Sequence, residues 1–71
     1  MNIEERYTGV FFVNGEQQFS EIKGRSESHV CMQMRNFIKT NTSEGWIMKQ
    51  KTIDFHITRA EDGHQMIVNW K

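Results

Sequence analysis

The chain has 71 residues, and its nine basic and nine acidic side chains give a formal net charge of zero. This length fits one domain, 1–71, near the lower size at which a hydrophobic core is stable without disulfides or metals. The zero net charge removes the long-range attraction that favours binding to polyanions, and the single cysteine excludes an intramolecular disulfide framework.

No run of apolar residues is longer than the four from Val10 to Val13. Neither a signal-peptide core nor a membrane span is therefore expected. A secreted domain of this size would usually need disulfides, which one cysteine cannot form within a chain. The expected location is the reducing cytoplasm.

Residues 6–23 are predicted to form a β-hairpin, after a frayed lead-in over residues 1–5. The stretch from Tyr7 to Val13 is rich in aromatic and β-branched residues, and a second strand-like run begins at Glu16. The Asn14-Gly15 pair between the two runs is typical of a type I′ turn, in which both central residues have positive φ.

This hairpin carries apolar residues on both of its faces. Outward from a two-residue loop, Val13 faces Glu16 and Tyr7 faces Ile22, and paired residues share a face. One face then carries Tyr7, Phe11, Val13 and Ile22. The other face carries Val10, Phe12 and Phe19.

Because one helix covers only one face of a sheet, two apolar faces need two coverings. We expect the face with Val10, Phe12 and Phe19 to join the core and the other face to form a protein interface. The sequence groups the residues but does not say which group meets the helix, so the reverse assignment stays open. A bulge or a twisted edge that brings these residues into one core is the alternative.

Residues 26–41, SESHVCMQMRNFIKTN, are predicted to form the one amphipathic helix. Its apolar residues follow the spacing i, i+1, i+4, i+7, i+8 and are Val30, Cys31, Met34, Phe37 and Ile38. At about 100° per residue they form one stripe, which must pack on a sheet. Ser26 is expected to be the N-cap, and Asn41 the left-handed residue that ends the helix.

Residues 46–70 are predicted to form a second hairpin around a turn at Asp62-Gly63. Its first strand is expected to run from Trp46 to Thr58 with a bend near Lys51. The strict alternation of apolar and polar residues from Ile53 onward is typical of a half-buried strand.

Pairing outward from this second turn sets Phe55 against Trp70 and Ile57 against Val68. The face that is predicted to meet the helix carries Phe55, Ile57, Met66, Val68 and Trp70. Because Trp70 belongs to this face, removal of Trp70 and Lys71 should destabilise the fold.

Together these elements predict an α+β fold of the type ββαββ. In this fold a four-stranded, mostly antiparallel sheet carries one amphipathic helix on one face. Whether the two hairpins pair within one chain or exchange between two chains stays open.

The sequence carries no specific catalytic, metal-binding or cofactor-binding motif. His29, His56 and His64 do not have the spacing of zinc ligands. Cys31 belongs to the apolar stripe of the helix, where a thiol behaves as a small hydrophobe. Glu61-Asp62 lie at a turn, with no apolar wall to raise either pKa. We therefore expect no enzyme, no metal and no cofactor.

Nucleic-acid binding is the alternative function. Lys49 and Lys51 are two residues apart in a predicted strand, and Arg35 and Lys39 share the exposed side of the helix. The Tyr7–Val13 strand is faintly similar to a strand motif of RNA-recognition domains, which stack bases on aromatic side chains. The chain lacks the two-helix plan of that family and has no net positive charge, so this interpretation ranks second.

The leading hypothesis is a small, non-catalytic cytoplasmic binding protein that acts as an adaptor, an inhibitor or a regulator through protein–protein contacts. The neutral chain offers little repulsion between copies. We therefore expect a homodimer, or contact with another protein, through the first hairpin at Tyr7, Phe11, Val13 and Ile22. No membrane partner is expected.

Overall fold

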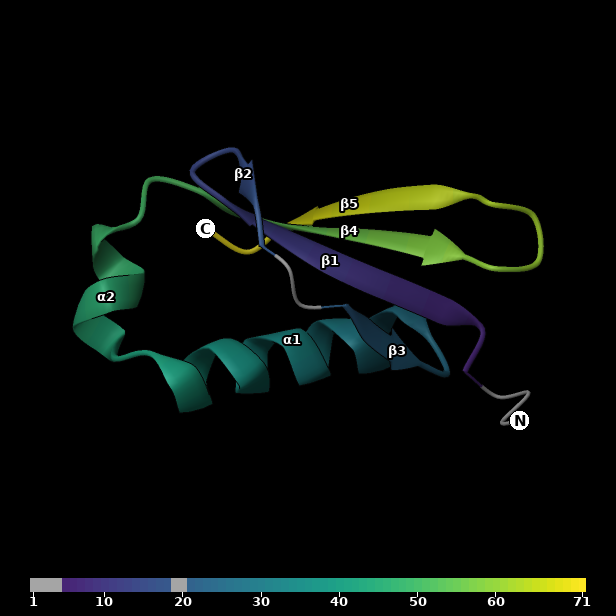
Figure 1. Cartoon of the computed structure of the whole chain (residues 1–71), viewed down its shortest axis with the longest axis horizontal. Helices are drawn as coiled ribbons and strands as arrows, with labels where there is room; N and C mark the ends of the chain where they lie inside the picture. The colour runs from purple at the N-terminus through teal and green to yellow at the C-terminus, as the bar shows by residue number, and fades with distance from the viewer. Residues whose placement is uncertain (1–4, 19–20) are drawn as a thin grey trace.

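The computed structural model describes residues 5–18 and 21–71 as an α+β fold of five strands and two helices (Figure 1). The elements are β1 (Tyr7–Val13), β2 (Glu16–Gln17), β3 (Ile22–Gly24), α1 (Glu27–Asn41), α2 (Glu44–Lys49), β4 (Ile53–Arg59) and β5 (Gln65–Asn69). Both β2 and β3 pair with one side of β1, and β4 and then β5 follow on the other side. All of these pairs are antiparallel.

The predicted turn at Asn14-Gly15 is confirmed, since both residues have positive φ, 52° and 84°. Val13 lies opposite Glu16 as predicted. Further along, however, Ile22 lies opposite Gly9 instead of Tyr7. The register at β3 is thus shifted by two residues relative to that at β2, and the predicted second strand is observed as the two strands β2 and β3. Phe19, whose predicted pairing with Val10 falls in this segment, lies outside the described residues, as do residues 1–4 of the expected lead-in.

The helix α1 begins and packs as its sequence predicts. The Ser26 hydroxyl accepts a hydrogen bond from the backbone N–H of His29 at 3.1 Å, which confirms the N-cap. The buried part of the stripe consists of Val30, Cys31, Met34 and Ile38, whereas Phe37 is 39% exposed at its margin. Asn41 does not take the left-handed conformation; Thr42 ends the helix in an extended conformation.

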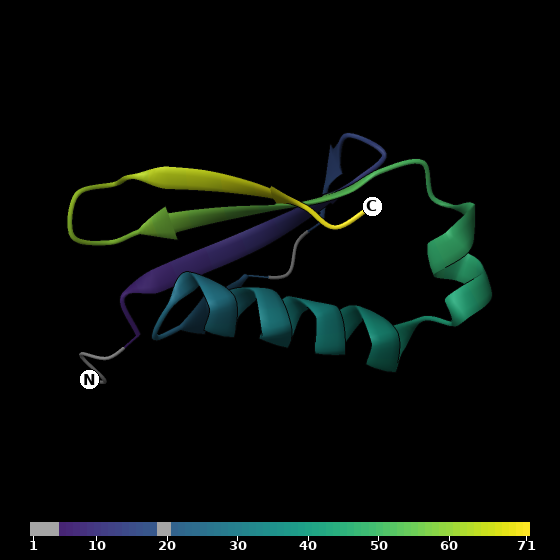
Figure 2. The ribbon, with the colours of Figure 1, turned by 180° about the vertical axis from the view of Figure 1, so that it is seen from behind.

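The second helix, α2, corrects the prediction of an extended strand from Trp46. The Ser43 hydroxyl accepts a hydrogen bond from the N–H of Trp46 at 3.1 Å, so a capped helical turn replaces the strand. No side chain of α2 is fully buried, although Trp46 and Ile47 pack against the core. Figures 1 and 2 show α2 at one end of the molecule, between α1 and the start of β4.

The second hairpin has the predicted faces but a shifted register. Ile57 lies opposite Met66, and Phe55 opposite Val68, two positions away from the predicted partners. The loop is longer than two residues because the Asp62 carboxylate binds the Arg59 guanidinium and the N–H of His64. A shift of two residues keeps every side chain on its predicted face.

The C-terminal end of the chain is tied to the sheet. The ring of Trp70 lies 5.7 Å from that of Phe55, and the backbone N–H of Trp70 donates to the Ile53 carbonyl at 2.9 Å. The Lys71 ammonium donates to the carbonyls of Ile47 and Met48, at the end of α2 where a cation is favourable.

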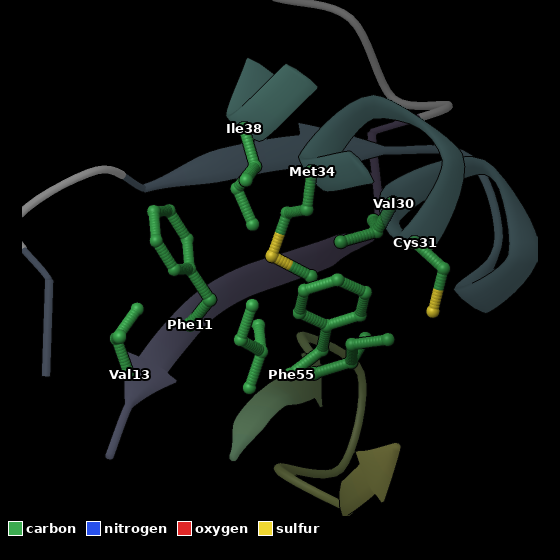
Figure 3. Packing of buried hydrophobic residues seen from close by; sticks show 9 residues of the cluster. Phe11, Val13, Val30, Cys31, Met34, Ile38 and Phe55 are labelled. Carbon is green, nitrogen blue, oxygen red and sulfur yellow. The ribbon is translucent and has the colours of Figure 1, made fainter. Parts of the chain in front are cut away.

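The hydrophobic core lies between α1 and the sheet face formed by alternate residues of β1 and β4 (Figure 3). Met34 points from α1 toward the sheet, between Phe11 and Phe55, and all three side chains are buried. A Cβ at Gly9 would lie 2.4 Å from Cγ1 of Val30, so the glycine permits the close approach of helix and strand. Within residues 5–18 and 21–71, no helix has the length and apolar character needed to cross a membrane.

Candidate functional site

The candidate site is the sheet face that points away from α1, which we call the open face. It consists of the residues of each strand that alternate with the buried ones, arranged in three rows across the sheet. The central row contains Val10, His56 and Ile67. The rows on either side are Gln17, Phe12, Asp54 and Asn69 at one end, and Lys23, Thr8, Thr58 and Gln65 at the other.

The centre of the open face consists of the central row together with the neighbouring Phe12, and it is apolar and aromatic. The rings of Phe12 and His56 lie 4.1 Å apart, centroid to centroid, with an interplanar angle of 34°. Val10 is half-buried beside them, and Ile67 is 64% exposed at the edge of the row. A contiguous apolar group with a polar surround is typical of a contact surface on a soluble domain.

The rim of the open face is polar and electrically balanced. Asn69 donates a hydrogen bond to the Asp54 carboxylate at 2.5 Å, which holds both side chains in place. Lys23 and Asp54 lie in opposite outer rows and carry opposite charges. Glutamine, threonine and asparagine supply the rest of the rim, so no strong field of either sign covers this face.

The structure corrects the predicted interface on the first hairpin. Phe11 and Val13 are only 5% and 8% exposed, because they form the floor on which α1 packs. Tyr7 and Ile22 lie on the same side, partly buried against that core. The reverse assignment, which the sequence left open, is the observed one. Val10 and Phe12, which were predicted to join the core, therefore lie on the open face instead. Phe19, the third residue of that set, lies outside the described residues.

The four basic residues proposed for nucleic acid do not lie on the open face. Lys49 ends α2 and Lys51 follows in a bend, so they are not neighbours on one strand. Arg35 and Lys39 are on α1, on the other side of the sheet, and the Arg35 Nε atom is buried without a hydrogen-bond partner in the described structure. Lys39 lines a hollow together with Glu44 and Ile47, so an acidic side chain lies near it.

Three further titratable groups, His29, Cys31 and Asp62, have environments that the local structure explains. The Nδ1 atom of His29 accepts a hydrogen bond from the N–H of Arg25 at 3.1 Å. Burial raises the pKa of the Cys31 thiol, which favours the less reactive protonated form. The Arg59 guanidinium holds the pKa of Asp62 well below its usual range. In the part of the chain that the structure describes, no three His, Cys, Asp or Glu side chains are grouped to hold a metal ion.

Sequence reasoning missed His56 and Ile67 as site residues, although both alternate along the chain with the residues that were predicted to face the helix. The available signal was Ile67, a large apolar residue on a side that is otherwise polar. Its importance becomes visible only when β4 is paired with β1, which places Val10 opposite His56 and aligns it with Ile67.

The chain was compared with protein-family models, with curated proteins and with solved structures, and no match was found in any of the three comparisons.

Proposed function

We propose that the protein is a small, non-catalytic binding protein that acts through protein–protein contacts and self-associates through the open face. The observation that supports this proposal is the apolar centre of Val10, Phe12 and Ile67 around His56, on the side of the sheet opposite α1. Burial of apolar surface stabilises a contact by about 25 cal/mol per Å² removed from water. A second covering layer would therefore be favourable here.

A second copy of the chain is the partner that we propose for this face. A two-fold contact uses the same patch on both subunits, so the patch has to be complementary to itself. A centre without lysine, arginine, aspartate or glutamate meets this requirement, and the opposite charges of Lys23 and Asp54 in the outer rows allow each to approach the other across the contact. Two sheets packed face to face lie about 10 Å apart with interdigitated side chains.

A protein partner suits the open face better than nucleic acid does. Lys23 is the one lysine or arginine among the described residues of the three rows. Binding to phosphates needs several such cations and weakens steeply with salt, whereas an apolar contact tolerates moderate salt. Nucleic-acid binding through Arg35, Lys39, Lys49 and Lys51 stays the second candidate, and no contact among the described residues favours it.

The proposal is tested by the solution mass from light scattering over a range of protein concentrations. We expect the wild type to exceed the mass of one chain, and Phe12→Glu to weaken self-association at least about tenfold while the fold is retained. Met32→Glu is the matched control, since it adds the same charge at a residue of α1 that is 52% exposed. Equal self-association of Phe12→Glu and the wild type would overturn the proposal.

A location in the reducing cytoplasm and a role as an adaptor, an inhibitor or a regulator are parts of the same proposal. Cys31, the single cysteine, is buried in the core and free, as expected for a protein that does not depend on disulfides. The fold itself does not choose among the three roles, because one fold serves many functions.

A further inference from the structure

The edge of the sheet at β5 is a second surface that could bind a partner, because backbone groups of this strand point away from the sheet. The N–H of Arg59 donates to the His64 carbonyl at 2.8 Å, and the N–H of Trp70 donates to the Ile53 carbonyl at 2.9 Å. In an antiparallel ladder these bonds recur at every second residue. The backbone N–H and C=O groups of Gln65, Ile67 and Asn69 therefore point away from β4, toward the free edge.

Nothing in the described structure satisfies or protects this edge. Residues 5–18 and 21–71 contain no strand that pairs with β5 other than β4. The β5 sequence, Gln-Met-Ile-Val-Asn, has no charge and no proline. Charged residues, proline, bulges and very short strands are the devices that normally prevent edge-to-edge pairing.

The opposite edge of the same sheet shows these devices. It is divided into β2 and β3, which have two and three residues, and it carries Glu16 and Lys23. The contrast indicates that pairing is blocked at one edge and left available at the other. Figures 1 and 2 agree that the β4–β5 hairpin projects away from α1, so the helix does not cover β5.

We propose that β5 pairs antiparallel with β5 of a second copy, with Ile67 on the two-fold axis. In this register Gln65 lies opposite Asn69 of the second copy, and Met66 opposite Val68 of the second copy. An amide therefore meets an amide on the open face, and an apolar side chain meets an apolar side chain on the helix side. The outward backbone N–H and C=O groups of Gln65 would form hydrogen bonds with those of Asn69 in the second copy, and those of Ile67 with Ile67 of the second copy.

The proposed pairing uses none of the contacts at the two ends of β5. The Lys71 ammonium is bound to the carbonyls of Ile47 and Met48, and the Asp62 carboxylate is bound to Arg59. A second copy is the occupant that we choose because every position of β5 meets a chemically similar or complementary residue of itself.

The consequence for the open face is that it doubles in width. Paired residues of antiparallel strands share a face, so both helices would lie on one side and both open faces on the other. The central row would then run from Val10 through His56 and Ile67 into the same three residues of the second copy. The edge contact uses backbone groups that the open-face contact does not use, so the two contacts are separable by mutation.

The test uses the Phe12→Glu variant as background, in which the open face is disabled. In this background, Gln65→Glu with Asn69→Lys places opposite charges across the proposed pair, and Gln65→Lys with Asn69→Lys places like charges there. We expect light scattering to give a dimer for the first combination and at least about tenfold weaker association for the second. Both share Asn69→Lys beside Asp54, and circular dichroism checks that both are folded.

A cross-link supplies a second measurement that does not depend on charge. In the same background, Ile67→Cys places two thiols in a directly opposed pair with a Cα separation of about 5.5 Å, which a disulfide can span. Gln65→Cys is the control, because its copies would lie more than about 13 Å apart along the strands. Oxidation should give covalent dimers of Ile67→Cys and few of Gln65→Cys.

The outcomes separate this proposal from the open-face proposal. A Phe12→Glu variant that is monomeric at all concentrations would overturn the β5 pairing and leave the open face as the self-contact. Equal association of the two charge combinations, or equal cross-linking of the two cysteine variants, would also overturn the β5 pairing. An unchanged mass of Phe12→Glu relative to the wild type would instead overturn the open-face proposal.

Discussion

The two faces of this sheet are built from the same strands, yet they have different environments. On β1, Phe11 is 5% exposed beneath α1, whereas its neighbour Phe12 is half-buried and its ring contacts that of His56 at a tilt. On β4, Phe55 is fully buried, and His56 points to the opposite side. Adjacent residues of one strand therefore lie in different environments, one in the core and the other on the open face.

This difference teaches that an apolar residue in a small sheet is not evidence of a core. With one helix of 15 residues, the chain can cover only one face. The apolar residues of the other face add little to the stability of the isolated chain, so their presence needs another reason. Contact with a second molecule is the reason that we propose, and mutations on the two faces separate the two roles.

The largest difference between the faces is expected for Phe55→Ala and Phe12→Ala. Phe55 is fully buried, so its truncation should lower the free energy of unfolding by about 3–5 kcal/mol, a large share of the stability of so small a domain. Phe12→Ala should cost about 1 kcal/mol, because the side chain is covered on one side only. Urea denaturation at low protein concentration measures both. Equal losses of stability would remove the distinction between the faces.

Removal of Trp70 and Lys71 should have the next largest effect. The half-buried Trp70 ring packs on Phe55, and its loss should cost about 3 kcal/mol, at the lower end for a large aromatic residue. Thermal unfolding measures the change. Lys71→Ala is the control, since it removes only the exposed ammonium contacts with α2 and should cost less than about 1 kcal/mol. A shortened chain that melts like the full chain would contradict the anchoring role of Trp70.

Gly9→Ala is the smallest change that tests the covered face. The new methyl group would lie 2.4 Å from Val30 and 2.8 Å from the Met34 methyl group, so the helix or the strand has to move. Overpacking of this kind typically costs about 1–3 kcal/mol. Thr8→Ala, on the open face of the same strand, should change the free energy of unfolding by less than about 1 kcal/mol. A neutral Gly9→Ala would show that the helix does not pack this closely.

Most of the fold follows from local patterns in the sequence. Asn14-Gly15 specifies its turn, Ser26 caps its helix, and the alternation after Ile53 defines the faces of the second hairpin. The register was correct beside the first turn, but at β3 and in the second hairpin it was wrong by two residues. In the second hairpin the Asp62 carboxylate holds Arg59 and the N–H of His64, which closes a loop longer than the predicted two residues. The faces were nevertheless correct, since a shift of two residues preserves them.

Two features of the fold do not follow from hydrophobic periodicity and turn residues alone. The helix α2 has only six residues, and its Trp-Ile-Met run resembles a strand. The choice of the covered face was ambiguous because both faces of the first hairpin are apolar. Gly9 was the signal that could have resolved it, since it shares the covered face with Phe11 and lets α1 approach β1.

The most direct test of the difference between the faces is the backbone amide NMR spectrum of the wild type, recorded as the protein is diluted. Self-association through the open face predicts concentration-dependent shifts at Val10, Phe12, His56 and Ile67, with the amides of α1 from Val30 to Ile38 unchanged. Shifts that gather on α1, or a spectrum that does not change with concentration, would contradict the claim that the open face is the binding surface.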